Sequence, residues 1–167
     1  MTYYNEISEG YEELHKEEQE KKITIIKPVM KELFHLKPTD KLLDVGCGTG
    51  LTTGPWDCIK TGIDPAPKLI EKAICKATGT SYKIASAENI PFPDNSFDIV
   101  ISITAIQNFA DIEKGLTEIK RVGKDRFILS FLKKSPKREL ITNLIQKHFK
   151  IKKTIEEEKD LIYFCTI

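Results

Sequence analysis

The residues best suited to chemistry form the run 44–50, Asp-Val-Gly-Cys-Gly-Thr-Gly, directly after the apolar pair Leu42-Leu43. A short apolar run that ends in a glycine-rich turn is typical of a strand whose carboxyl end faces a ligand in an open parallel sheet. Gly46 and Gly48 carry no Cβ, so the backbone can approach a ligand closely there. The G-x-G-x-G spacing differs from the fingerprints of dinucleotide sites and of phosphate-binding loops.

Two carboxylates accompany this turn. Asp44 stands just ahead of it, where a negative charge would repel a pyrophosphate but attract the ammonium group of an amino acid. Asp64 follows Gly62-Ile63, twenty residues further on, and a carboxylate there can accept hydrogen bonds from both hydroxyls of a ribose. With Pro65 next to it, Asp64 could instead cap the following helix. The two carboxylates together predict a ligand with a positive end, a ribose and no phosphates.

The elements that must position these residues alternate between β-rich apolar runs and amphipathic helical stretches. This alternation predicts an α/β, doubly wound, Rossmann-like sheet with helices on both faces. The last two strands are joined by a turn too short for a parallel crossover, so we expect the parallel sheet to close with an antiparallel C-terminal hairpin. The predicted strands are 42–45, 59–64, 81–85, 97–102, 126–131, 149–155 and 161–166.

The segments between these strands have apolar residues at helical spacing. Apolar stripes predict helices around 69–74 and 112–119, the second opened by Asp111 as an N-cap, and a third that starts at Ser135-Pro136. Gly79 and Gly123 stand where helices should stop. We expect one domain over 1–167, with a core over 41–167 and a helical segment over 1–36. Within that segment Pro28 should kink or restart the helix.

The charges, cysteines and apolar runs of the sequence indicate what kinds of partner, metal site and cellular location to expect. Net charge is +1, but residues 114–153 carry thirteen Lys and Arg against three acids. Such a stretch can bind a phosphate-rich partner or can be the solvated faces of helices. The four cysteines are scattered, without a C-x-x-C pair, so we expect free thiols and no metal site. No apolar run is long enough to span a bilayer, and the acidic start does not resemble a signal peptide, so a cytoplasmic protein is expected.

With these motifs the chain resembles class I S-adenosylmethionine-dependent methyltransferases over residues 41 to about 132. The run 85–98, Ala-Ser-Ala-Glu-Asn-Ile-Pro-Phe-Pro-Asp-Asn-Ser-Phe-Asp, is similar to the ubiquinone-biosynthesis-type branch, methyltransferase type 11. The final hairpin matches the family's reversed last strand. The resemblance implies that S-adenosylmethionine is the cofactor and S-adenosylhomocysteine the product.

The resemblance also implies a role for each matched position. Asp44 would face the methionyl amino group, Asp64 would bind the ribose, and Ser86 and Ala87 would flank the adenine. The predicted cofactor site comprises Asp44, Gly46, Cys47, Gly48, Gly50, Asp64, Pro65, Ser86, Ala87, Glu88 and Ser102.

The chain departs from the family pattern in two places. Ser86 stands where an Asp commonly meets the adenine amino group, which weakens one polar contact. Only eleven residues separate Gly50 from Gly62, so the helix usually found there must be very short or frayed.

On the acceptor side, Gln107 and Asn108 replace a frequent His-His pair and cannot act as a strong base; they could equally serve the helix start and packing. The absence of an Asn-Pro-Pro-Tyr or Asp-Pro-Pro-Tyr motif argues against methylation of adenine N6 or of a glutamine amide. Tyr4 and Tyr11, in the N-terminal segment, are the other acceptor-side candidates. No residue is an obvious catalytic base.

The sequence leaves the acceptor open between RNA or a ribonucleoprotein bound by the basic stretch, a protein, and a small metabolite. A protein subunit could also complete the site. The alternative function is a cofactor-binding regulatory or partner-dependent protein that keeps this fold without independent activity. A nicotinamide-dependent reductase is disfavoured by Asp44 and by the glycine spacing.

Overall fold

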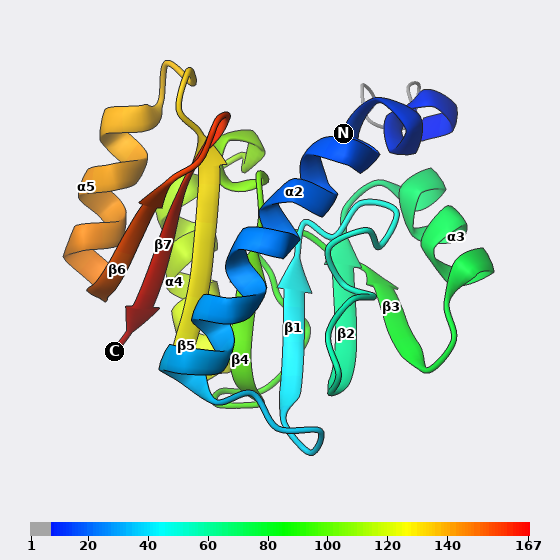
Figure 1. Cartoon of the computed structure of the whole chain (residues 1–167), viewed down its shortest axis with the longest axis horizontal. Coiled ribbons are helices and arrows are strands. Elements are labelled where there is room, and N and C mark those ends of the chain that lie inside the picture. The colour runs from blue at the N-terminus through cyan, green and yellow to red at the C-terminus, as the bar shows by residue number, and fades with distance from the viewer. Residues whose placement is uncertain (1–7) are drawn as a thin grey trace.

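A computed structural model describes the backbone from Ser8 to Ile167 and the side chains from His15 onward. Seven strands form one sheet in the order β3-β2-β1-β4-β5-β7-β6 (Figure 1). The strands are β1 Lys41–Val45, β2 Ile59–Asp64, β3 Thr80–Ile84, β4 Phe97–Ser102, β5 Gly123–Leu132, β6 Lys150–Glu156 and β7 Asp160–Thr166. The helices are α2 Ser8–Phe34, α3 Pro67–Lys76, the 3-10 turn η1 Ile106–Asn108, α4 Ile112–Val122 and α5 Arg138–His148.

The strand directions confirm the predicted fold class. Strands β1 to β5 pair in parallel, whereas β7 is antiparallel to both β5 and β6. Only β7 is therefore reversed within the sheet. The order changes direction at β1, whose neighbours are β2 and β4, and ligands bind at such a switch point in open α/β sheets.

Element boundaries differ from the predictions in several places. Gly79 does not stop α3, which already ends at Lys76. Residues 135–137 form a turn, and α5 begins only at Arg138, whose amide donates to the Ser135 carbonyl at 3.1 Å. Gly123 ends α4 as predicted. It also begins β5, which therefore starts three residues before the predicted strand 126–131. The predicted restart of the helix at Pro28 is wrong: α2 is one continuous helix from Ser8 to Phe34, with Pro28 inside it. Pro28 and Thr24 are exposed, so water can bond the Thr24 carbonyl that the proline ring leaves without a donor.

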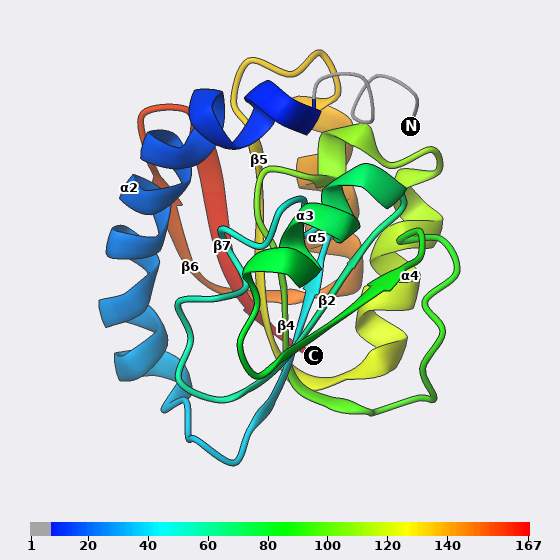
Figure 2. The ribbon, with the colours of Figure 1, turned by 90° about the vertical axis from the view of Figure 1, so that its right-hand side faces the viewer.

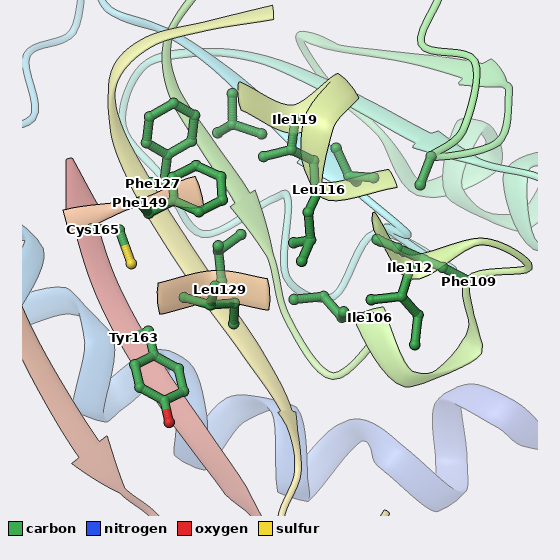
Figure 3. Packing of buried hydrophobic residues seen from close by; sticks show 14 of the residues in the cluster. Ile106, Phe109, Ile112, Leu116, Ile119, Phe127, Leu129, Phe149, Tyr163 and Cys165 are labelled. Atoms are coloured by element: carbon green, nitrogen blue, oxygen red, sulfur yellow. The ribbon is translucent and has the colours of Figure 1, made fainter. Parts of the chain in front are cut away.

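Two apolar layers cover the sheet. Figure 2 shows α2 on one side of the sheet, with α4 and α5 on the other. The side chains of Ile23, Ile26 and Met30 in α2 pack with Leu42, Ile99, Ile128 and Phe164 on the first face. On the second face Leu116 and Ile119 of α4 pack with Phe127, Leu129 and Phe149 (Figure 3). Burial on both faces explains the continuously apolar strands β4 and β5.

No helix among residues 8–167 is long and apolar enough to cross a membrane. Across the described residues no group of three or more His, Cys, Asp or Glu side chains is arranged to hold a metal ion. The four cysteines are free thiols.

Candidate cofactor site

The glycine turn after β1 depends on backbone conformations that favour glycine. Gly46, Gly48 and Gly50 have φ angles of +77°, +56° and +89°. The amides of Gly46 and Cys47 donate to the Ile63 carbonyl at 2.8 and 3.0 Å, which ties the turn to β2. Residues with a Cβ are strained in this region, so the spacing of the three glycines follows from the shape of the turn.

Gly46 also lies against the loop that follows β4. A Cβ placed on Gly46 would lie 2.5 Å from the Ala105 Cβ, a separation too short for two carbon atoms. The preceding residue, Thr104, has a φ of +56° although it is β-branched. The backbone at Gly46 and the loop at Ala105 therefore meet closely, and both line the same cavity.

Asp44 is fully buried at the end of β1. Its Oδ2 accepts hydrogen bonds from the hydroxyls of Thr52 and Thr53, both at 2.7 Å. Its Oδ1 has no hydrogen-bond partner among the described residues. Burial raises the pKa of Asp44 to about 6, which the two threonine hydroxyls partly oppose. A buried carboxylate with one unsatisfied oxygen suits a cation that brings hydrogen-bond donors.

Asp64 lies at the end of β2, one strand away. Its Oδ2 accepts from the Gly48 amide at 3.0 Å and its Oδ1 from the Ala66 amide at 2.9 Å. Burial raises the pKa of Asp64, against the opposing effect of these two amides. The capping interpretation is wrong, because the N-cap of α3 is Ala66 and no side chain caps that helix, although Asp64 does accept from the Ala66 amide. Each carboxylate oxygen can still accept a second hydrogen bond, so the ribose interpretation is compatible with these contacts.

A cavity of about 450 Å³ opens beside these residues. Such a volume is in the range of cofactor pockets. The cavity is lined by Gly46, Asp64, Pro65, Leu69, Ser86, Ala87, Glu88, Thr104, Ala105, Asn108, Phe109 and Ala110. The lining comes from the ends of β1, β2, β3 and β4, so the structure brings together side chains that are far apart in the sequence.

Seven of the predicted site residues line this cavity, whereas six others do not. The lining set is Gly46, Asp64, Pro65, Ser86, Ala87, Glu88 and Asn108. Those that do not line it are Asp44, Cys47, Gly48, Ser102, Gln107 and Gly50, the last of which lines a second cavity of about 250 Å³. The Ser102 hydroxyl donates to the Val45 carbonyl at 2.8 Å, and the Gln107 amide donates to the Thr104 carbonyl at 3.0 Å. The side chains of Tyr4 and Tyr11 lie outside the described residues.

Five lining residues were not predicted: Leu69, Thr104, Ala105, Phe109 and Ala110. Leu69 was assigned to a helix stripe, and its side chain is buried as predicted while also reaching the cavity. Phe109 and Ala110 directly follow the predicted site residues Gln107 and Asn108, so their position in the sequence could have identified them as lining residues. Thr104 carried no signal, because nothing in a threonine predicts a positive φ.

The segment between the glycine turn and β2 contains only turns, as its length predicted. Trp56 belongs to this segment. Its side chain is buried, and its indole N–H donates to the Thr52 carbonyl at 2.7 Å. The hydrogen bonds of Thr52 and Thr53 to Asp44 therefore depend on a packed turn instead of a helix.

The basic stretch 114–153 is spread over α4, β5, α5 and β6. At least five of its thirteen cations form ion pairs with carboxylates: Arg121, Lys124, Arg126, Lys133 and Lys147. The free positive charge is therefore smaller than the sequence count, and an RNA-binding surface stays a prediction.

Comparison with known proteins shows to which family this chain is related. The family model described as "Methyltransferase domain" matches residues 43–131, which is more than half of the chain. A demethylmenaquinone methyltransferase of Symbiobacterium thermophilum is 37% identical over 109 residues, covering 56% of this chain and 43% of that protein. A protein of unassigned function from Methanocaldococcus jannaschii is 29% identical over 163 residues, covering 96% of this chain and 62% of its own length. The chain thus spans less than two thirds of either relative.

Solved structures share the fold. The first is a complex between the Trm112 methyltransferase activator of Haloferax volcanii and a methyltransferase, with a TM-score of 0.78, 15% identity, and coverage of 98% of this chain and 96% of that one. The second is the PH0226 protein from Pyrococcus horikoshii, with a TM-score of 0.73, 19% identity, and coverage of 88% and 90%.

Proposed function

Because this chain belongs to the methyltransferase domain family, which uses S-adenosylmethionine, we propose that it transfers the cofactor's methyl group to an acceptor presented at the 450 Å³ cavity. The observation that carries the proposal is the pair of carboxylates at the ends of β1 and β2. Asp44 has an unsatisfied buried oxygen, and Asp64 lines the cavity. A ligand with an ammonium group at one end and a ribose in the middle satisfies both.

In this proposal the chain's residues bind and orient the cofactor. Asp44 attracts the methionyl ammonium, and the glycine turn lets the methionyl backbone approach without obstruction. Asp64 accepts hydrogen bonds from the ribose hydroxyls, while Ser86, Ala87 and Leu69 pack around the adenine. Burial raises the pKa of the Cys47 thiol well above its usual range, so Cys47 is a neutral part of the turn and not a nucleophile.

When bound, S-adenosylmethionine supplies an electrophilic methyl group on a sulfonium centre, and that positive charge disappears on transfer. The chain therefore has little acid or base work to do. Its contribution is to align the acceptor atom and to exclude water, which can lower the barrier by several kcal/mol, about 7 in favourable cases. Gln107 and Asn108 are neutral, so an acceptor that arrives protonated would need its own route for the proton.

In this proposal, the acceptor side of the cavity is the part of its lining that Asn108, Phe109 and Ala110 contribute. We propose that the acceptor meets the methyl group at this rim of the 450 Å³ cavity. RNA, protein and small metabolites remain the three acceptor classes. The departure at 104–108 from the Asn-Pro-Pro-Tyr pattern argues against adenine N6 or a glutamine amide as the acceptor atom.

The test has two stages. Calorimetric titration with S-adenosylmethionine, S-adenosylhomocysteine and NAD should give binding of the first two and none of the third. A labelled-methyl assay against cell extract, separated into RNA, protein and small-molecule fractions, should then label one fraction. Binding of NAD alone would revive the reductase hypothesis and contradict the proposal.

A second candidate is a methyltransferase that acts only with a partner subunit. It is favoured by the similarity over 98% of this chain to a methyltransferase solved in complex with an activator. The alternative predicts that the isolated chain binds S-adenosylmethionine weakly or transfers no methyl group, and that a co-purified protein restores both. Full activity of the isolated chain would exclude it.

A further inference from the structure

A buried ion pair lies on the far side of the cavity wall, outside the proposed contacts with the cofactor. Lys22 of α2 and Asp160 of β7 have side-chain exposures of 1% and 0%, and their Nζ and Oδ1 atoms lie 3.1 Å apart. A buried ion pair contributes little net stability, because the loss of hydration offsets the attraction between the charges. Its place in this fold therefore calls for another explanation.

Thr104 lies at the centre of this pair. Lys22 Nζ donates to the Thr104 hydroxyl at 2.7 Å, and that hydroxyl donates to Asp160 Oδ2 at 2.6 Å. Ser130 completes the cluster, since its hydroxyl donates to Asp160 Oδ2 at 2.8 Å and accepts from the Thr104 amide at 2.9 Å. We call Lys22, Ser130 and Asp160 the Thr104 clamp. It joins α2, β5 and β7 to one residue of the loop after β4.

The clamp holds Thr104 in an unfavourable conformation. Thr104 has a φ of +56°, which is strained for a β-branched residue and persists only when its surroundings fix it. This backbone direction places the next residue, Ala105, against Gly46 of the glycine turn. Thr104 and Ala105 both line the 450 Å³ cavity. The strain is therefore located where the wall of the cavity meets the glycine turn.

We infer that Lys22 and Asp160 are positioning residues for the cofactor cavity: they hold Thr104 in the left-handed conformation that fixes the 104–105 wall against Gly46. The inference rests on the proposed function for its effect on the cofactor. Its effect on the loop can be measured without any ligand. In consequence the N-terminal helix and the cavity are coupled through one buried lysine.

The test replaces Lys22 by Met, which keeps an unbranched side chain, shorter by one atom, and removes its charge. The matched control is Lys21→Met, because Lys21 is the neighbouring residue of α2 and pairs with Glu158 in an exposed position, at 57% and 69% exposure. Lys22→Met should weaken S-adenosylmethionine binding at least tenfold and speed hydrogen exchange of the 103–108 amides in the free protein. Lys21→Met should change neither by more than about twofold.

A double-mutant cycle with Thr104→Gly distinguishes the positioning of Thr104 by Lys22 from a general contribution of Lys22 to the stability of the fold. Glycine adopts a positive φ without strain, so the wall no longer needs the clamp. In the Thr104→Gly background, Lys22→Met should therefore have a much smaller effect on cofactor binding than in the wild type. An equal loss in both backgrounds would overturn the inference.

The inference can still be tested if Lys22→Met does not fold or if the wild-type chain does not bind the cofactor. Should Lys22→Met fail to fold, Lys22→Met/Asp160→Asn removes both charges together, and the same two measurements apply to it. Should the wild-type chain bind no S-adenosylmethionine, the proposed function fails while the exchange measurement still decides the inference. Unchanged exchange of 103–108 in a folded clamp variant would overturn it.

Discussion

The Gly48 amide donates to Asp64 Oδ2 at 3.0 Å, so the glycine turn after β1 is bonded directly to the carboxylate at the end of β2. The Ala66 amide holds the other oxygen of Asp64, at 2.9 Å. Asp64 is therefore fixed in orientation before any ligand arrives. A ribose that binds there does not have to order the side chain, which lowers the entropic cost of binding.

Gly46→Ala should unfold the glycine turn locally and destabilise the protein. The new Cβ would lie 2.5 Å from the Ala105 Cβ at a φ of +77°. Backbone strain and overpacking add, so we expect a loss of about 3 kcal/mol and a fall in Tm of roughly 10 °C. Cofactor binding should be lost as well. Thermal denaturation and calorimetry measure the two effects.

Gly79→Ala is the control, because Gly79 has a similar φ of +72° but open space around the position of a Cβ. It should cost only about 1 kcal/mol of backbone strain and leave cofactor binding intact. Equal losses for the two variants would show that contact with Ala105 is unimportant.

Asp44 should make the free protein less stable as the pH rises. Its pKa of about 6 in the folded state lies above its ordinary value, so the folded state favours the protonated form. This contribution to stability is fully present below about pH 4, is lost as the pH rises through about 6, and amounts to roughly 3 kcal/mol.

Asp44→Asn removes the titration and should be more stable than the wild type at pH 7.5, yet bind S-adenosylmethionine at least tenfold more weakly. Asp64, whose pKa is also raised by burial, adds a pH dependence of the same sign. The relevant quantity is therefore the difference in Tm between variant and wild type from pH 4 to pH 8. A difference that does not vary with pH would contradict the account of Asp44.

The RNA hypothesis for the basic stretch makes a quantitative prediction about salt. Binding of a single-stranded RNA oligonucleotide should weaken steeply with salt concentration. Charge reversal at Lys134 and Arg138 should lower the magnitude of the slope of log K against log salt by about 1.4, since each lost phosphate contact removes about 0.7. Reversal at Lys124, which already pairs with Asp98, is the control and should change the slope less. RNA binding that is insensitive to salt would contradict the hypothesis.

Local pattern was enough to predict most of the fold. The predicted bounds of β1, β2 and β4 were correct to within a residue. Burial on both faces explains the apolar centres of β1 and β4, whereas the first half of β2 is polar and not buried. Asp111 caps α4 as predicted, with its side chain accepting from the Lys114 amide at 3.0 Å. The start of α5 was misplaced because Ser135-Pro136 also suits a turn, and nothing local separates the two.

The cavity was only partly predictable. Asp64, Ser86 and Ala87 belong to motifs at strand ends and were identified from them. Thr104 depends on contacts with Lys22, Ser130 and Asp160, which are 82, 26 and 56 residues away in the sequence. Such a conformation arises from tertiary structure alone, so no reading of local sequence could find it.

The central claim is tested most directly by calorimetric titration of S-adenosylmethionine into the wild-type chain and into Asp64→Ala, with Asp57→Ala as the control. Asp57 is an exposed carboxylate between the glycine turn and β2 that does not line the cavity. We predict that Asp64→Ala weakens binding by more than about tenfold, roughly 1.4 kcal/mol, while Asp57→Ala leaves it unchanged. Equal affinity of Asp64→Ala and the wild type would contradict the placement of the cofactor at this site.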